Sequence, residues 1–173
     1  MLIVQKYGGS SVANAERVLN VAKRIMRTRM EGHDVVVVLS AQGKTTDGLI
    51  AKAKEINHKP SRREMDMLLS TGEQQSVALM SMAISAIGGR AVSLNGAQVG
   101  IETTNTYSNA RIRTINTERI ENELEAKKTL PLKETKEYLY NILNHYFVSY
   151  DSTEGYRNDL AKFKQFTFAN KKV

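Results

Sequence analysis

The sequence has no cysteine, no tryptophan and only two prolines among its 173 residues. Without cysteine, neither a disulfide framework nor a thiolate zinc site is possible, and a reducing compartment suits such a chain. The three histidines, His33, His58 and His145, have no spacing typical of metal ligands. The residues therefore predict no metal site.

Long apolar runs are also missing. No stretch is long enough to span a bilayer and the first residues have no signal-peptide pattern, so we expect a cytoplasmic protein that does not bind membranes. A chain of 173 residues suffices for one domain with a buried core, or for one domain with an appendage. The net charge of +7 favours anionic ligands without choosing among nucleotides, nucleic acids and acidic metabolites.

The composition changes near residue 128. All four phenylalanines and five of the seven tyrosines follow this position, whereas ten of the eleven glycines precede it. We therefore predict a domain over residues 1–128 and a helical or irregular tail over residues 129–173. Lysines alternate with phenylalanines near the end of this tail, a mixture that can bind single-stranded nucleic acid. Packing of these aromatic rings on the parent domain is the favoured interpretation, so nucleic-acid binding is not expected.

The first residues combine a short apolar segment, a lysine and two adjacent glycines. Leu2–Val4 predicts a strand, and Lys6 and Gly8–Gly9 follow it. Glycines let the backbone approach a ligand closely, and the free N–H groups of a following helix favour an anion. The same stretch is also compatible with an ordinary turn in which Ser10 or Ser11 caps a helix. The residues alone leave both interpretations open.

A second strand is predicted over Val35–Leu39, after a stretch with helical spacing from Val12 to Met26. A β-branched run without alternation is typical of a parallel sheet that is buried on both faces. The first 40 residues thus predict a β-α-β unit. In such sheets, ligands bind beyond the carboxyl ends of the strands. If these two strands are neighbours, the Lys6 loop and the Ser40–Asp47 loop face the same crevice.

The Ser40–Asp47 loop contains Gly43-Lys44-Thr45, which resembles the end of a Walker A motif. That motif requires a glycine at position 38, where this chain has valine, so a Walker A loop is rejected. We expect Thr45 and Thr46 both to cap the following helix and to contribute to ligand binding.

Ser61 and Glu64 have the spacing of a capping box. The pattern then predicts a short helix, an interruption at Ser70–Glu73 and a second helix that ends at Gly88. A carboxylate in the first turn after such a break usually interacts with the helix dipole. Periodicity alone therefore favours a helix-dipole interaction for Glu73 over a functional role.

Two further strands are predicted, over Arg90–Leu94 and over Ala110–Ile115. Asn95 and Gly96 form a pair that is common in hairpin turns, although no clear partner strand follows directly. Thr117 is a candidate cap for a last helix before the boundary.

Four stretches of the chain together resemble one family closely. They are Lys6–Ser11, Val35–Asp47, Arg63–Glu73 and Asn109–Ile112. In this order and at these intervals they resemble the N-terminal part of aspartate kinase, a member of the amino-acid kinase superfamily, over about residues 1 to 128. The resemblance implies a three-layer α/β/α sandwich with a mainly parallel sheet.

The resemblance also implies a reaction, namely transfer of the γ-phosphoryl group of ATP, with Mg²⁺, to the side-chain carboxylate of L-aspartate. The product is aspartyl phosphate, the entry to lysine, threonine and methionine biosynthesis. By the same resemblance, two groups of residues bind the substrates. Lys6 would be catalytic and would bind phosphates with Tyr7, Gly8, Gly9 and Ser10, while Ser40, Thr45, Thr46 and Glu73 would bind aspartate.

The chain departs from the family after residue 128. The family continues with an apolar strand, a Gly-Arg-Gly-Gly-Ser-Asp type segment, adenine-binding loops and, in most members, regulatory ACT domains, none of which is present here. Two hypotheses follow. The chain is an impaired aspartate kinase that lacks most of its nucleotide site, or it is a non-catalytic module that binds aspartate or a phosphate-bearing metabolite. We expect a homo-oligomer or pairing with a full-length kinase.

Overall fold

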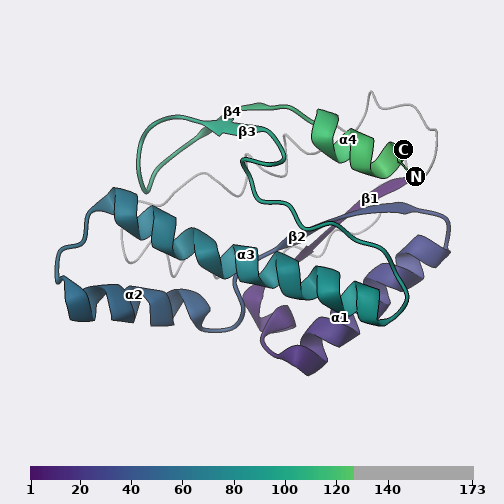
Figure 1. Cartoon of the computed structure of the whole chain (residues 1–173), viewed down its shortest axis with the longest axis horizontal. Coiled ribbons are helices and arrows are strands. Elements are labelled where there is room, and N and C mark those ends of the chain that lie inside the picture. Colours follow the sequence, from purple (N-terminus) through teal and green to yellow (C-terminus); the bar gives the residue numbers. More distant parts are fainter. Residues whose placement is uncertain (127–173) are drawn as a thin grey trace. The chain divides into compact units, whose positions relative to one another are not determined.

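The computed structural model describes residues 1–126 and divides into two units, each of which is considered by itself (Figure 1). The first unit contains Met1–Ser93, and the second begins at Leu94. All the candidate site residues belong to the first unit. The predicted tail over residues 129–173, with its helix and its lysine–phenylalanine pattern, lies outside the described residues.

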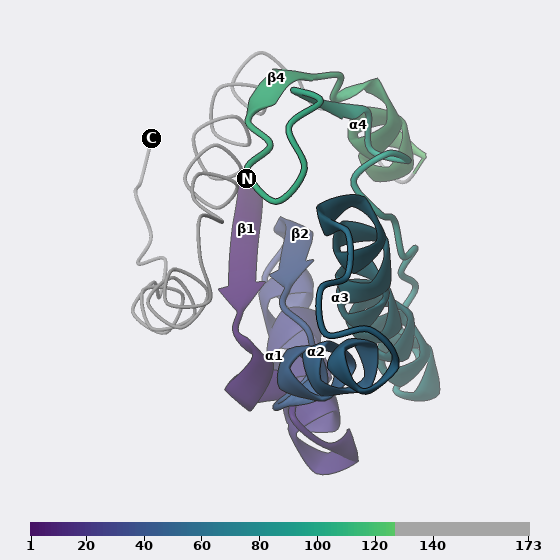
Figure 2. The same cartoon turned by 90° about the vertical axis from the view of Figure 1, so that its left-hand side faces the viewer.

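Two parallel strands form the sheet of the first unit. Strand β1 (Leu2–Tyr7) pairs with β2 (Asp34–Leu39) in a register that matches Leu2 with Asp34 and Tyr7 with Leu39. Helix α1 (Ala15–Met30) connects the two strands, so the predicted β-α-β unit is confirmed. Because both strands end at the same level, the loops that follow them leave from the same edge of the sheet (Figure 2).

The core of the first unit lies between this sheet and two helices. Helices α1 and α3 (Arg62–Ala86) pack against each other and against β2 (Figure 2). Tyr7, Val35 and Val37 pack against the buried residues of these helices. Because side chains alternate along a strand, Lys6 extends from the opposite face of the sheet. The α/β class predicted from the sequence is confirmed.

The start of α1 differs from the prediction. Gly9–Val12 forms a 3-10 helix, and Asn14 caps α1 by accepting a hydrogen bond from the Arg17 N–H at 2.9 Å. The prediction that Ser10 or Ser11 caps this helix was therefore wrong. An N-cap residue directly precedes the first turn of its helix, whereas both serines lie inside the 3-10 turn and Asn14 occupies that position.

Helix α2 (Thr45–Ile56) packs against α3 and also begins differently from the prediction. Lys44 occupies the cap position, and no side chain caps the helix. Thr45 and Thr46 lie within the first turn, so the prediction that they cap the helix was wrong. Their hydroxyl groups are consequently not engaged as caps.

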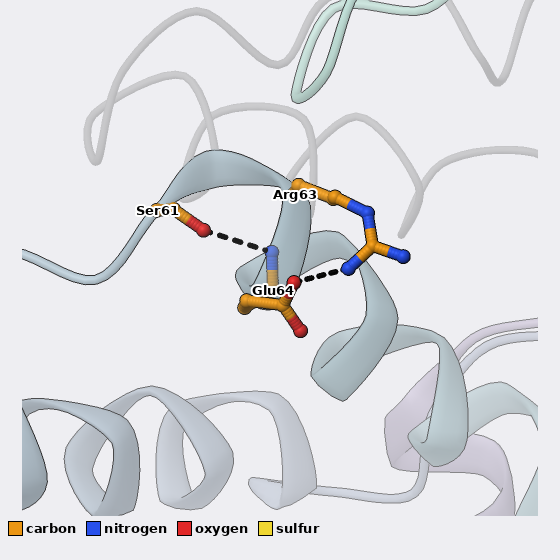
Figure 3. Close-up of polar contacts among 3 residues, drawn as sticks. All are labelled: Ser61, Arg63 and Glu64. Atoms are coloured by element: carbon orange, nitrogen blue, oxygen red, sulfur yellow. Dashed lines mark hydrogen bonds and ion pairs between the residues drawn. The ribbon is translucent and has the colours of Figure 1, made fainter.

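Half of the predicted capping box at the start of α3 is confirmed (Figure 3). The Ser61 hydroxyl accepts a hydrogen bond from the Glu64 N–H at 3.3 Å. The Glu64 carboxylate, however, pairs with the guanidinium of Arg63, its neighbour in the chain. Both side chains of this ion pair are exposed, so the pair contributes little to stability.

Helix α3 is continuous from Arg62 to Ala86, so the predicted interruption at Ser70–Glu73 was wrong. The hydroxyl of Thr71 donates to the Leu68 carbonyl at 2.7 Å, which satisfies this polar side chain inside the helix. Gly72 is buried, and a methyl group there would lie 2.9 Å from Ala41 Cβ. The glycine thus serves close packing and does not end the helix.

The second unit contains a small antiparallel sheet and a short helix. Strand β3 (Ile101–Thr103) pairs with β4 (Ile112–Ile115), and α4 (Glu118–Glu125) follows. The predicted strand at the end of Ala110–Ile115 and the helix after Thr117 are confirmed. Strand β3 was not predicted, because three residues are too few to produce a recognisable alternation.

The predicted strand over Arg90–Leu94 was wrong. This segment has no regular structure, and Val92 is 51% exposed. A strand needs a hydrogen-bonded neighbour, and the sheets within residues 1–126 consist only of β1 with β2 and of β3 with β4. The Ser81 hydroxyl donates to the Ala91 carbonyl at 3.2 Å and attaches the segment to α3. None of the helices in this part of the chain has the length and apolar character needed to cross a bilayer.

Two helical glycines give a matched test of the packing around Gly72. Gly72→Ala introduces a methyl group 2.9 Å from Ala41 Cβ, and overpacking of this kind costs about 1–3 kcal/mol. Gly48→Ala in α2 meets nothing within 4 Å and gains helix propensity worth about 0.5–1 kcal/mol. We expect urea unfolding followed by circular dichroism to show a loss of stability for Gly72→Ala and a gain for Gly48→Ala. Equal changes in the two variants would contradict the proposed packing.

Candidate active site

The turn after β1 and the loop after β2 are in direct backbone contact. The Gly43 N–H donates to the Gly9 carbonyl at 3.0 Å. A Cβ atom at Gly9 would lie 2.4 Å from the Ala41 carbonyl oxygen, a separation that no side chain tolerates. Only glycine therefore lets these two segments meet. The prediction that the two loops share one edge of the sheet is confirmed.

Helix α3 also contacts the loop after β2. Gly72 lies against Ala41, and the next residue, Glu73, accepts a hydrogen bond from the Ala41 N–H through Oε1 at 3.2 Å. The Thr45 methyl group lies 3.5 Å from the position that a Cβ atom would take at Gly72. The Lys6 turn, the Ser40 loop and Glu73 thus meet around Ala41.

Lys6 is the penultimate residue of β1 and is 8% exposed. Burial lowers the pKa of its amine from 10.5 to about 8. A Cβ atom at Gly8 would lie 3.7 Å from Nζ, so the amine is close to the glycine turn. An anion bound at this turn would stabilise the protonated amine and offset the cost of burying its charge.

Glu73 carries the opposite charge and undergoes the opposite pKa shift. The residue as a whole is exposed, but protein atoms surround its carboxyl group and the resulting loss of hydration raises the pKa. The hydrogen bond from the Ala41 N–H partly counteracts this shift, because it stabilises the carboxylate. A cationic group such as an ammonium would stabilise the charged form further.

Ser40 and the two threonines provide hydroxyl groups on the segment that contains Ala41 and the start of α2. Ser40 follows β2 directly, is 9% exposed, and donates its N–H to the Tyr7 carbonyl at 3.1 Å. Within residues 1–126, no hydrogen bond engages its hydroxyl, which leaves it available to a ligand. Thr45 and Thr46 are half-buried in the first turn of α2.

The structure does not bring the side chains of Tyr7 and Ser10 to this group. The Tyr7 ring packs on the α1 side of the sheet, and its hydroxyl donates to Gln5 Oε1 at 2.9 Å. The Ser10 carbonyl accepts a hydrogen bond from Arg17 at 2.5 Å. A role of either residue at the phosphate turn would therefore depend on the backbone.

Two groups that shape the candidate site were not predicted from the sequence. The Ala41 N–H contacts Glu73, and the Gln42 side chain donates to the Val12 carbonyl at 2.6 Å, which connects the β2 loop to the turn after β1. A contact made by a backbone amide cannot be predicted from residue types, because every residue except proline has this group. A glutamine in a polar loop cannot be distinguished by sequence from other surface residues. The described part of the chain contains no group of three or more acidic, histidine or cysteine side chains that could hold a metal ion.

Comparisons with known proteins agree on one family. The model of the amino acid kinase family matches residues 1–136. Aspartokinase from Bacillus sp. (strain MGA3) is 52% identical over 127 residues, which is 73% of this chain and 31% of the relative. Aspartokinase from Geobacillus stearothermophilus is 56% identical over 119 residues, which is 69% of this chain and 29% of the relative. The chain thus spans about three tenths of the length of these curated relatives.

A solved structure supports the same conclusion. The crystal structure of aspartate kinase from Synechocystis matches with a TM-score of 0.64 and 51% sequence identity. The match covers 75% of this chain and 21% of that chain. The α/β architecture described above is therefore the architecture of the corresponding part of that enzyme.

The buried amine of Lys6 predicts a pH-dependent contribution to stability. Between pH 8 and 10.5 the amine is neutral in the folded chain and protonated in the unfolded chain, so the unfolded state binds more protons and stability rises with pH. Below pH 8 both states are protonated, and the folded state carries the full cost of the buried charge. We expect the free energy of unfolding of the native chain, measured in urea relative to Lys6→Met, to rise between pH 7 and 10. A difference in unfolding free energy between the native chain and Lys6→Met that did not change with pH would contradict this prediction. Lys52→Met, which removes an exposed lysine, is the control and should show no such pH dependence relative to the native chain.

Proposed function

The chain belongs to the amino acid kinase family, and from this premise we propose that it carries the aspartate-binding part and the lysine turn of an aspartokinase-type phosphotransferase. The reaction would transfer the γ-phosphoryl group of ATP to the side-chain carboxylate of L-aspartate. The meeting of the glycine turn after Lys6, the loop that begins at Ser40, and Glu73 around Ala41 is the observation that supports this proposal best.

Charge neutralisation is the first requirement of this reaction, because ATP and aspartate are both anions. Phosphoryl transfer depends mainly on positioning and on electrostatic stabilisation of the transferred group. The Lys6 amine and the backbone N–H groups of Gly8, Gly9 and Ser10 would bind the phosphates, as donors that are fixed before the substrate arrives. Mg²⁺ supplied with ATP would contribute further positive charge at the phosphates.

Aspartate binding would use the loop after β2 together with Glu73. Glu73 would accept the substrate ammonium, which restores to its carboxylate the charge stabilisation that burial removes. The hydroxyls of Ser40, Thr45 and Thr46 would hold the substrate carboxylates. In this arrangement the substrate lies between a cation and an anion of the protein, and its reacting carboxylate is directed towards the phosphate turn.

A non-catalytic role is the second candidate, because Glu73 and the loop after β2 could bind aspartate without any phosphoryl transfer. The match covers 31% of the length of the Bacillus sp. aspartokinase. In this role the chain would bind aspartate or a phosphate-bearing metabolite, or would pair with a full-length kinase as a regulatory module. The first role predicts product formation, whereas the second predicts binding alone.

The two half-sites can be separated by calorimetric titration with ATP–Mg²⁺ and with aspartate. We expect Lys6→Met to weaken ATP binding at least tenfold while aspartate binding is retained, because a charge-assisted hydrogen bond contributes about 1.5–3 kcal/mol. Glu73→Gln should have the converse effect. Lys52→Met removes the same charge from an exposed position of α2 and should leave both affinities unchanged. If Lys6→Met and Glu73→Gln weakened both ligands equally, the proposed division of roles would be wrong.

Activity distinguishes the two candidate functions. An acyl phosphate reacts with hydroxylamine, so incubation of the purified chain with ATP, Mg²⁺, aspartate and hydroxylamine reports phosphorylation of the substrate. Hydroxamate that forms with the native chain and not with Lys6→Met would support the kinase. Aspartate binding without hydroxamate formation would support the non-catalytic module. Absence of both aspartate and ATP binding would contradict the kinase and the aspartate-binding form of the non-catalytic module.

A further inference from the structure

A separate cavity of about 310 Å³ lies between the 3-10 turn at residues 9–12 and helix α1. Its polar lining consists of Ser10, Ser11, Arg17, Asn20 and Arg24. The Tyr7 ring and Val21 add an apolar wall. Lys6, Ser40, Thr45 and Glu73 do not line it. The cavity therefore shares a turn with the candidate active site but uses different side chains.

The polar side chains of this cavity suit an anion. Arg17 and Arg24 lie two helical turns apart, with Asn20 between them on the same face of α1. No carboxylate lines the cavity. The ion pairs within residues 1–126 involve other arginines, so no carboxylate in this part of the chain pairs with either of these two guanidinium groups. Two cations, an amide and two hydroxyls thus line one cavity that is largely open to solvent.

The Arg17 guanidinium is already held in place. Its Nη1 donates to the Ser10 carbonyl at 2.5 Å, and its backbone N–H donates to the Asn14 cap. A long side chain that is ordered before the ligand arrives loses less conformational entropy on binding. Arg17 also keeps further N–H groups for a ligand, because a guanidinium has five donors.

Arg24 approaches the aromatic wall of the same cavity. Its positive charge lowers the pKa of the Tyr7 hydroxyl, which opposes the larger upward shift caused by burial. The Tyr7 hydroxyl donates to Gln5, so the ring contributes to the cavity mainly as an apolar surface. The site therefore offers cationic donors beside a flat apolar wall.

We propose that this cavity binds a small organic phosphate at a site distinct from the candidate active site. Arg17, Arg24 and the Ser10 and Ser11 hydroxyls would hold the phosphate group, since guanidinium groups match its oxygen geometry in a bidentate manner. The volume lies at the lower end of the range of small-molecule sites and exceeds what a bare phosphate fills. The organic part of the ligand would lie against Tyr7.

The test uses the whole chain, NMR spectra of the arginine Nε–H and asparagine side-chain N–H groups, and two probes, inorganic phosphate and glycerol 3-phosphate. We expect saturable shifts at Arg17, Asn20 and Arg24, with tighter binding of glycerol 3-phosphate. Arg24→Gln should weaken binding at least tenfold. Arg27→Gln removes the same charge from the same helix outside the cavity and should leave the affinity within twofold of the native value.

Three results would overturn the proposal. Equal weakening by Arg24→Gln and Arg27→Gln would indicate unspecific attraction to a basic helix. Loss of these shifts in Lys6→Met would place the anion at the candidate active site. The absence of saturable shifts with either probe would exclude the cavity as a site. Arg24→Lys preserves the charge and should bind with intermediate affinity, so a loss caused by misfolding of Arg24→Gln can be recognised. None of these readouts requires turnover.

Discussion

Close backbone packing at two glycines is the constraint on which the candidate site depends. Gly9 allows the turn after β1 to approach the Ala41 carbonyl, and Gly72 allows α3 to approach Ala41 from another direction. A side chain at either position would separate the three segments by a few tenths of an ångström or more. The separation would move Glu73 away from the Ala41 N–H and Lys6 away from the β2 loop. The chemistry of the charged residues therefore depends on the absence of a methyl group at each glycine.

The sequence predicts some of this arrangement well. An uninterrupted β-branched run at Val35–Leu39 and the short strand before Lys6 have few alternatives to a parallel pair, and their pairing places the two loops at one edge. Local sequence patterns give wrong predictions where tertiary contacts determine the secondary structure. Gly72 looks like a helix breaker until its contact with Ala41 is known, so Glu73 was assigned to a helix start when it lies in the middle of α3. Arg90–Leu94 has strand-like residues but no partner strand within residues 1–126.

The pKa shifts of Lys6 and Glu73 have one cause and opposite directions. Burial disfavours the charged form of each group, so the amine loses protons more easily and the carboxyl group holds them more tightly. Burial therefore penalises the protonated amine of Lys6 and the ionised carboxylate of Glu73 alike. A ligand that is anionic at one end and cationic at the other relieves both penalties at once, and an amino acid placed beside a phosphate has this charge distribution. Groups whose pKa values are shifted by burial cluster at functional sites, and structural ion pairs also shift pKa values, so the contacts around Ala41 carry the argument for a site here.

The alternation of side chains along β1 explains how one turn could contribute to two proposed anion sites. Lys6 and Tyr7 are neighbours in the chain, yet they extend from opposite faces of the sheet. The amine of Lys6 reaches the glycine turn, whereas the Tyr7 ring faces α1 and its arginines. The hydrogen bond from Arg17 to the Ser10 carbonyl links the cavity to the turn that contains Gly9. The same 3-10 turn therefore packs against Ala41 through Gly9 and positions Arg17 through the Ser10 carbonyl, so one short segment supports both the Lys6 turn and the cavity proposed for a phosphate.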